Sequence, residues 1–419
     1  MGKRYALDLS AVVMASTIRK NKPDSNFFRF EAILKEPVDK DILQKSVDNL
    51  RHEFPFFYVN LKKNFFEYYF EEMECSYKVL SDGDFPYMHA GTMLASSCCM
   101  QILYRGKMIA AEFSHSLTDG YGGEVYICRL ADEYIRLRYG VKLTQEPALY
   151  DRSLERSTED VFLEKVSGHG VLKPGERCYK CRGTAQNTGH IKVTTAVVDT
   201  MRLTGAAREI NVTLTALIGA VMTETLLSVQ NGDHKSHRKL PVSIVIPVNI
   251  RNYYDSITMK NGSYFCNLII SGDEKPENFS QLCQEISRQL RDNSSKETLE
   301  LSISAGKDML CSPFFVHLPL MLKIAIIRLG YDVFGGRSSS INLSNMGKCF
   351  SSSDREKYVD RINFLGNVEF TYPITCSIIT YGSKTYINIS SCLNTDYIEK
   401  DFIGYLRELG LDPVIELRR

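Results

Sequence analysis

The 419-residue sequence contains no tryptophan and has almost no net charge, because 51 basic residues are balanced by 50 acidic ones. Such a balance provides no extended basic surface, which argues against a nucleic-acid partner. The sequence also lacks a Gly-x-Ser-x-Gly elbow, a phosphate-binding loop and a dinucleotide fingerprint. Its 44% hydrophobic and 24% charged residues are typical of a globular protein. The length predicts two domains of roughly 200 residues each.

Long apolar runs are also scarce. Residues 1–8 lack the apolar core of a secretory signal, and Ala6 stands where a myristoylation motif requires Ser or Thr. The most apolar helix candidate, residues 314–329, is interrupted by Pro319 and Lys323 and is too short to span a bilayer. We expect it to pack on the core rather than to lie on a membrane or line a substrate tunnel. We therefore expect a cytoplasmic protein without stable membrane insertion.

The 12 cysteines are dispersed along the chain, which predicts reduced thiols in a cytoplasmic protein. Only Cys178 and Cys181 have the spacing of metal ligands, and His169 and His190 flank them as the remaining ligands of a zinc site. Residues 177–183 alternate like a strand, however, and a strand would direct the two cysteines to opposite faces. We therefore expect no metal.

Hydrophobic periodicity predicts alternating strands and helices in two parts of the chain. The first part has expected strands at 27–35, 54–61, 65–70, 98–104 and 108–113, and helices at 39–51 and 122–139. Residues 141–176 have the texture of a linker, with one short helix at 158–166. The second part has expected strands at 178–183, 190–198, 243–249, 339–343, 363–371, 375–380 and 385–390, and helices at 200–209, 213–229, 276–309 (a pair) and 396–409. The shared order of elements predicts an α+β protein with two similar lobes.

The turn after the strand at 108–113 contains His115, Asp119 and Gly120, and a helix follows. Strand ends are rigid and the turns beyond them are accessible, so reactive groups are often placed there. Histidine can take and return a proton near neutral pH. An arbitrary His-x-x-x-Asp-Gly match is nevertheless more often a loop histidine followed by a capping aspartate. The motif alone therefore decides little.

In its context, the segment from His115 to Gly120 resembles the His-x-x-x-Asp-Gly signature of the chloramphenicol-acetyltransferase-like superfamily. That group includes alcohol acyltransferases, polyketide-associated acyltransferases and the condensation domains of peptide synthetases. Further segments resemble it in order and spacing along nearly the whole chain: Leu7-Asp8, Pro37-Val38-Asp39, Phe54-Pro55-Phe56, Pro247-Val248-Asn249-Ile250-Arg251, Tyr264-Phe265-Cys266-Asn267 and Ser344-Asn345-Met346-Gly347.

Two departures place the chain within that group. Condensation domains usually have a second histidine just before the active one, and Ser114 stands there. Plant-type acyltransferases have an Asp-Phe-Gly-Trp-Gly segment, which a chain without tryptophan cannot contain. Both departures favour the free-standing alcohol-acyltransferase-like branch.

The resemblance implies a pseudo-dimer of two chloramphenicol-acetyltransferase-like α/β sandwich lobes, with the active site in a tunnel between them. We expect an N-terminal lobe over residues 1–145, a crossover linker over 146–176 and a C-terminal lobe over 177–419. We also expect a monomer.

The resemblance also implies roles for two motif residues. His115 would be the general base that takes the acceptor's proton and returns it to the leaving thiolate, while its other ring nitrogen is held by a local carbonyl. Asp119 would turn away from the imidazole and pair with Arg251, which would lock the turn that aims His115. The alternative is an N-cap Asp119 unrelated to Arg251.

Other residues are candidates for substrate binding. Gly120, Gly122 and Gly123 would let the backbone approach a ligand closely, the alternative being simple flexibility at a helix start. Ser344 or Asn345 could donate to the developing oxyanion, the alternative being an asparagine that caps a turn. The remaining seven histidines have no triad spacing.

The function implied is acyl transfer from a coenzyme A thioester to a hydroxyl or amine acceptor. Acyl-CoA would be a co-substrate, with no permanently bound cofactor and no metal. Two alternatives stay open: the donor is a carrier protein's phosphopantetheine thioester, or the chain is a non-catalytic docking protein of the same fold.

Overall fold

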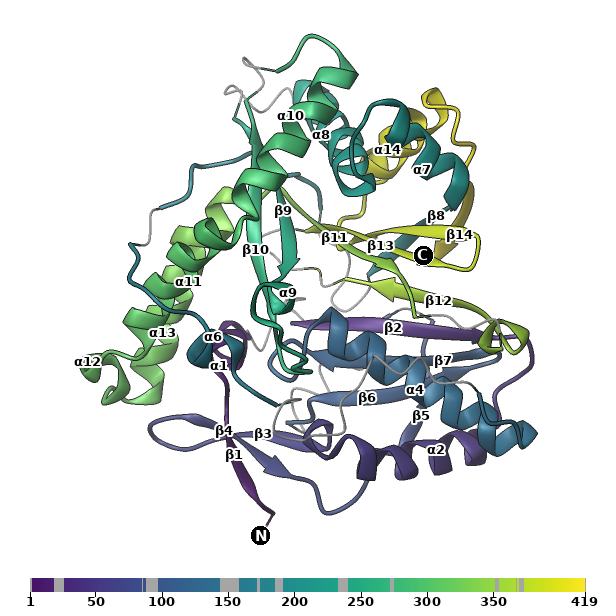
Figure 1. Ribbon diagram of the computed structural model, residues 1–419, viewed down its shortest axis with the longest axis vertical. Coiled ribbons are helices and arrows are strands. Elements are labelled where there is room, and N and C mark those ends of the chain that lie inside the picture. The colour runs from purple at the N-terminus through teal and green to yellow at the C-terminus, as the bar shows by residue number, and fades with distance from the viewer. Residues whose placement is uncertain are drawn as a thin grey trace.

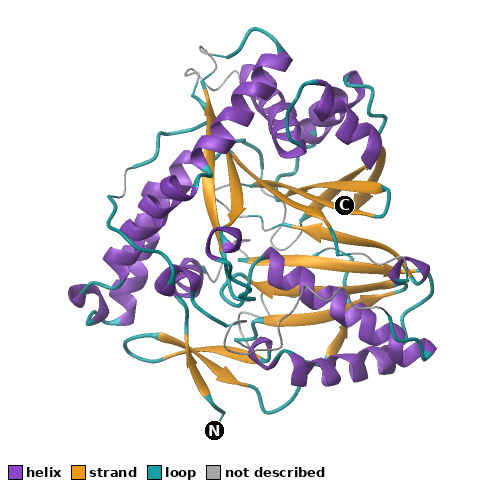
Figure 2. Ribbon diagram, in the orientation of Figure 1, coloured by secondary structure: helices purple, strands orange, loops and turns teal. Residues whose placement is uncertain are grey.

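The computed structural model describes residues 2–18, 26–84, 86–87, 97–143, 158–171, 174–184, 191–232, 240–271, 275–350, 354–366, 368 and 373–418. Within these residues the strands form three sheets, of five, seven and three strands. Figure 1 shows the five-stranded sheet in the lower half of the molecule and the seven-stranded sheet in the upper half, which we call the first and second lobes. Figure 2 shows helices mainly on the outside of both lobes.

The first lobe is built on a sheet with the strand order β12-β2-β7-β6-β5. Alternation along β2 explains how the sheet is covered. Phe28, Phe30 and Ala32 join the core that the helices cover, while Arg29 and Glu31 point to the other face and bind each other at 2.8 Å. The elements are β2 Phe27–Leu34, β5 Val79–Ser81, β6 Met100–Arg105, β7 Met108–Ser114, β12 Val359–Leu365, α2 Lys40–Glu53 and α4 Gly120–Tyr139.

The second lobe is built on a sheet with the strand order β10-β9-β11-β13-β14-β8-β15. The strands β9, β11 and β13 are parallel neighbours, and the other pairs are antiparallel. Its strands are β8 Lys192–Asp199, β9 Val242–Asn249, β10 Ser263–Ile270, β11 Ile341–Lys348, β13 Ile374–Tyr381, β14 Lys384–Ser391 and β15 Val414–Arg418. Its helices are α7 Thr200–Glu209, α8 Leu214–Gly232, α9 Arg251–Tyr254, α10 Phe279–Asn293, α11 Lys296–Leu310 and α14 Tyr397–Glu408.

The two lobes are interlocked through β12. This strand lies in the C-terminal part of the chain, yet it pairs antiparallel with β2 and completes the first sheet. Figure 1 shows β12 between β2 and β13, at the junction of the lobes. The division of the chain into lobes at residues 145 and 177 stays a prediction. That division assigns β12 to the C-terminal lobe, whereas the strand belongs to the sheet of the first lobe. Residues 146–157 of the expected crossover lie outside the described residues.

A small sheet and two helices lie beside this junction. The three-stranded sheet consists of β1 Arg4–Ala6, β4 Tyr68–Glu72 and β3 Val59–Lys63. Helix α1 Leu9–Thr17 begins at Asp8, whose side chain accepts a hydrogen bond from the Ala11 amide. It packs against α13 Leu320–Gly330, and the short helices α6 Val161–Glu164 and α12 Pro313–Val316 lie nearby.

Several predicted elements are wrong. Residues 54–61 contain a 3-10 turn at Pro55–Phe57 before β3, because proline starts the turn. Residues 177–183 form no strand, and strand β10 was not predicted. The apolar helix expected at 314–329 is broken before Leu320, because Pro319 cannot continue a helix.

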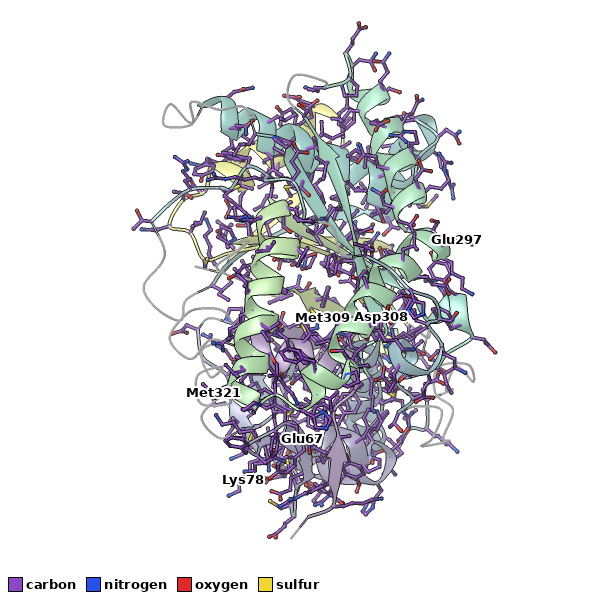
Figure 3. The ribbon with its side chains drawn as sticks, turned by 90° about the vertical axis from the view of Figure 1, so that its left-hand side faces the viewer. Glu67, Lys78, Glu297, Asp308, Met309 and Met321 are labelled. Atoms are coloured by element: carbon purple, nitrogen blue, oxygen red, sulfur yellow. The ribbon has the colours of Figure 1, made fainter. Side chains whose placement is uncertain are left out.

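That broken helix is also only partly packed on the core. Leu320 and Ile324 are buried, but Phe314, Met321 and Leu329 are 76%, 70% and 67% exposed. Figure 3, which views the molecule from the left-hand side of Figure 1, labels Met321. Among the described residues, no single helix has the length and apolar composition to cross a membrane, although α7 and α8, bent by 83°, would meet both criteria together.

Candidate active site

A cavity of about 420 Å³ lies between the two lobes. The first lobe contributes residues from β2, from the turn after β7, from the start of α4 and from β12. The second lobe contributes residues from β9, β10 and β11. The lining includes His115, Asp119, Gly120, Ser344 and Asn345, so five of the residues expected at the site share one cavity.

His115 directly follows the last residue of β7. Its backbone amide donates to the Asn26 carbonyl at 2.7 Å, and the neighbouring Ser114 amide donates to the Cys99 carbonyl at 2.8 Å. The imidazole packs against the Phe28 ring, with centroids 4.6 Å apart. Two neighbouring strands therefore fix the backbone from which the ring enters the cavity.

The expected carbonyl partner of the His115 ring is not present. No residue of the described segments forms a hydrogen bond with either ring nitrogen, and both stay available to a ligand. Burial lowers the pKa of His115 from 6.5 to about 4, although the Asp119 charge acts in the opposite direction. The ring is therefore neutral at pH 7 and can accept a proton.

Asp119 lies at the start of α4 and binds the second lobe. Its two oxygens accept from the Arg251 guanidinium at 2.8 and 2.9 Å in a two-pronged ion pair. They also accept from the Gly262 amide at 2.9 Å and the Ser263 hydroxyl at 2.7 Å. The expected pairing of Asp119 with Arg251 is confirmed. The aspartate also caps α4 by accepting from the Gly122 amide at 3.3 Å, so the cap is present but is not unrelated to Arg251.

Arg251 is held as tightly as its partner. Its remaining N–H groups donate to the Thr258 carbonyl at 2.7 Å, the Lys260 carbonyl at 2.6 Å and the Asn249 side chain at 3.1 Å. The guanidinium also lies over the Tyr121 ring at 4.6 Å. Asp119 and Arg251 are 1% and 3% exposed. All five N–H groups of this arginine are therefore occupied.

These contacts keep the buried Asp119 ionised. Burial alone would raise its pKa, but the Arg251 charge and the hydrogen bonds from Arg251, Ser263 and Gly262 outweigh burial and lower it. The pair cannot take up the proton that His115 receives. Its role is to join the turn after β7 to the second lobe.

The glycines of the turn let protein segments, rather than a ligand, approach closely. A Cβ on Gly122 would lie 2.4 Å from the Met259 carbonyl oxygen, and one on Gly123 would lie 2.6 Å from the Phe28 ring. Neither glycine lines the cavity within the described part of the chain, whereas Gly120 does. The expectation that Gly122 and Gly123 face a ligand is therefore wrong.

Ser344 and Asn345 differ in availability. The Asn345 amide donates to the Thr215 hydroxyl at 2.9 Å, and its oxygen accepts from the Gly347 amide at 2.9 Å. Asn345 thus stabilises the bulge between Asn345 and Lys348 in β11, a structural role like that of the turn-capping alternative. The Ser344 hydroxyl lines the cavity and has no hydrogen-bond partner among the described residues. Of the two, Ser344 is free to donate to a ligand.

The sequence analysis missed several polar residues of the lining, Glu124 and Asn342 among them. Glu124 lies five residues after Asp119 on α4, and Asn342 lies on β11 two residues before Ser344. A signal for Glu124 was present, because this charged residue stands beside Val125, Tyr126 and Ile127 on a buried helix. Asn342 could have been found from its strand position, since residues two apart on a strand share a face.

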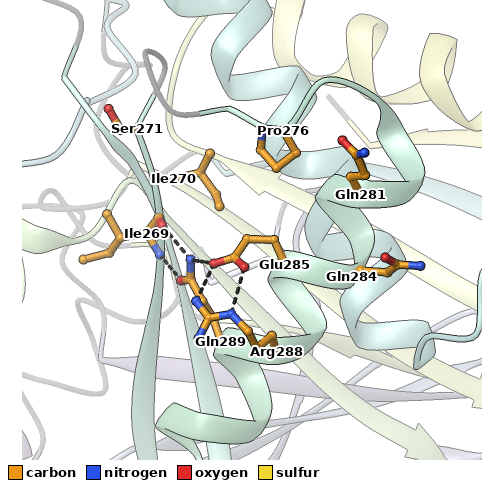
Figure 4. A pocket seen from close by; sticks show the side chains of 9 residues that line it. All are labelled: Ile269, Ile270, Ser271, Pro276, Gln281, Gln284, Glu285, Arg288 and Gln289. Carbon is orange, nitrogen blue, oxygen red and sulfur yellow. Dashed lines mark hydrogen bonds and ion pairs between the residues drawn. The ribbon is translucent and has the colours of Figure 1, made fainter.

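Other parts of the described chain form no comparable site. A cavity of about 440 Å³ lies between β10 and α10, but its charged residues bind each other, as Figure 4 shows. Arg288 pairs with Glu285 at 2.7 Å, and the Gln289 side chain covers the edge of β10 by pairing with both backbone groups of Ile269. His169 binds Asp308 at 2.9 Å, and His190 lies outside the described residues. No group of three metal-ligating side chains occurs among the residues described.

Comparison with known proteins locates the fold. No protein-family model and no curated protein matches the sequence. Among solved structures, polyketide synthase associated protein 5 from Mycobacterium tuberculosis matches with a TM-score of 0.60 and 15% identity, covering 96% of this chain and 97% of that one. The first condensation domain of the CDA synthetase matches with a TM-score of 0.62 and 13% identity, covering 98% and 97%.

A third similar structure is TRI101 from F. sporotrichioides, complexed with coenzyme A and T-2. It matches with a TM-score of 0.64 and 12% identity, covering 96% of this chain and 97% of that one. The chain therefore has the two-lobed fold of condensation domains and of TRI101 over nearly its full length. This confirms the expected two-lobed α+β fold.

Proposed function

We propose that this protein is an acyltransferase that moves an acyl group from a coenzyme A thioester to a hydroxyl or amine acceptor, with His115 as the general base. The observation that carries the proposal is the neutral, unpartnered imidazole of His115 in a cavity bounded by both lobes. The fold supports it, because TRI101 was solved with coenzyme A and a condensation domain of rhizomide synthetase with C8-CoA and Leu-SNAC.

In this proposal each of the named cavity residues has a separate role in the reaction. The acceptor oxygen or nitrogen attacks the thioester carbonyl while His115 takes its proton. As the tetrahedral intermediate collapses, the carbon–sulfur bond breaks and the imidazolium returns that proton to the thiolate. The Ser344 hydroxyl is a lining group without a partner among the described residues and can donate to the intermediate's oxygen, a contact worth roughly 3 kcal/mol in oxyanion holes. Asp119 and Arg251 hold the turn and take no proton.

A thiol-release assay with a panel of acyl-CoA donors and of alcohol and amine acceptors tests the proposal. We expect His115→Ala to lower the rate by about 10²- to 10⁴-fold, the range for general base catalysis. The exposed His52, in the last turn of α2, supplies the control His52→Ala, which we expect to react like wild type. Equal acceptor-dependent release by wild type and His115→Ala would contradict the catalytic role of His115.

The pH dependence provides a second check. With an uncharged alcohol as acceptor, kcat/KM should rise with pH through about 4, the lowered pKa of His115, and stay flat near neutrality. A rise centred above pH 6 would show that another group, or a solvated histidine, controls the reaction.

A second candidate is transfer from a thioester on a carrier protein. The similar structures favour it, since they include condensation domains of synthetases and a polyketide synthase associated protein. Supplying the same acyl group on coenzyme A and on a carrier protein distinguishes the two donors. Turnover with the acylated carrier alone would select the second candidate. No turnover with either donor would favour a docking protein of the same fold.

A further inference from the structure

The proposed reaction leaves one carboxyl group of the described cavity lining without a role. Glu124 is 3% exposed and lines the cavity from α4. One carboxylate oxygen accepts from the Phe350 amide at 3.1 Å. Because Asp119 is saturated by Arg251, Glu124 is the carboxyl group of the described lining that is free to bind a ligand.

Glu124 also has no cationic partner of its own. Lys348 lines the same cavity, and Arg355 is a further basic group nearby, which forms an ion pair with Asp132 through two contacts at 2.7 and 2.8 Å. No basic side chain of the described segments forms an ion pair with Glu124. Burial raises the pKa of Glu124 to about 7, while the Phe350 amide, Cys349 and Arg355 act in the opposite direction. Tyr121 and Asp119 on the same turn add no positive charge.

A second group of the cavity lining, the side chain of Asn342, also lacks a hydrogen-bond donor for its oxygen among the residues that the structure describes. This oxygen is buried. Asn342 lies on β11 of the second lobe and lines the same cavity as Glu124. Buried acceptors that lack a donor are costly, and a bound ligand can supply the missing donor. The two lobes thus both present oxygen acceptors to the cavity.

We propose that Glu124 binds an ammonium group of the acyl acceptor, so that the acceptor is an amino alcohol or a diamine rather than a simple alcohol. This inference rests on the proposed acyl transfer. Coenzyme A itself contains no alkylammonium group, so the donor's carrier does not meet the requirement of Glu124. Around neutral pH the protonated fraction of the carboxyl group loses its proton to solvent when the ammonium binds, which leaves a neutral ion pair.

Binding without a donor tests this directly. Isothermal titration calorimetry would compare 4-amino-1-butanol with 1-pentanol, which has the same length but no charge, and with 1,4-butanediol. We expect wild type to bind the amino alcohol roughly 10- to 100-fold more tightly than pentanol, the range for a hydrogen bond to a charged group. Titrations in two buffers of different ionisation enthalpy should show proton release on binding near pH 6.5.

A matched pair of variants locates the effect. Glu124→Gln keeps an oxygen for the Phe350 amide and should bind all three ligands with similar affinity and no linked proton release. Glu133→Gln, on the same helix but outside the cavity, should keep the wild-type preference. Equal affinity of wild type for amino alcohol and pentanol would overturn the inference, and this measurement does not require any variant to fold.

The outcomes separate this inference from the proposed function. If wild type shows no preference for the ammonium ligand but releases thiol in a His115-dependent way with pentanol, the result supports acyl transfer and contradicts the role of Glu124. If wild type prefers the amino alcohol but no donor gives turnover, the result supports ammonium binding by Glu124 and contradicts the proposed function.

Discussion

Asp119 and Glu124 are two carboxyl groups at the start of α4, and both line the same cavity. The pKa of Asp119 is lowered, whereas the pKa of Glu124 is raised. The two residues are 1% and 3% exposed, so burial disfavours the charge of both. Asp119 receives hydrogen bonds from a bidentate arginine, a hydroxyl and two backbone amides, and its pKa is lowered. Glu124 receives one from the Phe350 amide and one from the Cys349 side chain, and its pKa is raised to about 7. Donors, rather than burial, decide which carboxylate holds the structure and which is available to a ligand.

Removing one partner of the Asp119–Arg251 pair should produce the largest effect on stability. Asp119→Ala leaves a buried guanidinium unpaired, and Arg251→Ala leaves a buried carboxylate. We expect each to lower the free energy of unfolding by about 3–5 kcal/mol. Urea denaturation of wild type, both single variants and the double variant measures their coupling. We expect the double variant to lose much less than the sum, and strict additivity would disprove the pairing.

The pH dependence of stability should distinguish the two carboxyl groups by sign. The pKa of Glu124 rises from 4.5 to about 7 on folding, so the folded state holds its proton over that window and the unfolded state does not. Relative to Glu124→Gln, wild type should lose about 3 kcal/mol of stability as pH rises from 4.5 to 7. The measurement is urea denaturation of both proteins at intervals across this range. A constant difference between them would show that Glu124 is solvated.

Asp119 should behave in the opposite way. Its pKa is lowered from 3.8, so its stabilising contribution is complete above 3.8 and is lost as pH falls through the folded-state value. Relative to Asp119→Asn, wild type should therefore lose stability only in acid. If wild type lost stability relative to this variant between pH 5 and 7, the bidentate pair would not form in solution.

The contrast between the two carboxyl groups also explains what the sequence could predict. Asp119 belongs to a motif whose spacing and order were readable, and its partner Arg251 was identified from a matching segment of the second lobe. Both form the expected pair because backbone turns and a bidentate contact specify the residue types. Glu124 has no motif, and its state depends on Phe350, Cys349 and Arg355, which lie more than 200 residues away. Such neighbours are set by tertiary packing.

The strands also show which features the sequence could and could not predict. Central strands such as β2, β7 and β13 were predicted because their residues are buried and apolar. Strand β10 was missed, since it is an edge strand with exposed and half-buried positions whose backbone is partly satisfied by Gln289 and Asn293. The role of Gly122 was also misjudged, because its close neighbour Met259 comes from the other lobe.

Gly122 provides the smallest and most local test of how the start of α4 is held. Its amide donates to Asp119, and a Cβ there would lie 2.1 Å from the Thr118 hydroxyl and 2.4 Å from the Met259 carbonyl. We expect Gly122→Ala to lower the free energy of unfolding by roughly 1–3 kcal/mol, because backbone of the second lobe must shift. Gly205, inside α7, has no neighbour within 4 Å of its Cβ position. Gly205→Ala should therefore raise stability by up to about 1 kcal/mol. Urea denaturation of both variants measures the difference, and equal changes would show that the lobes do not meet closely at Gly122.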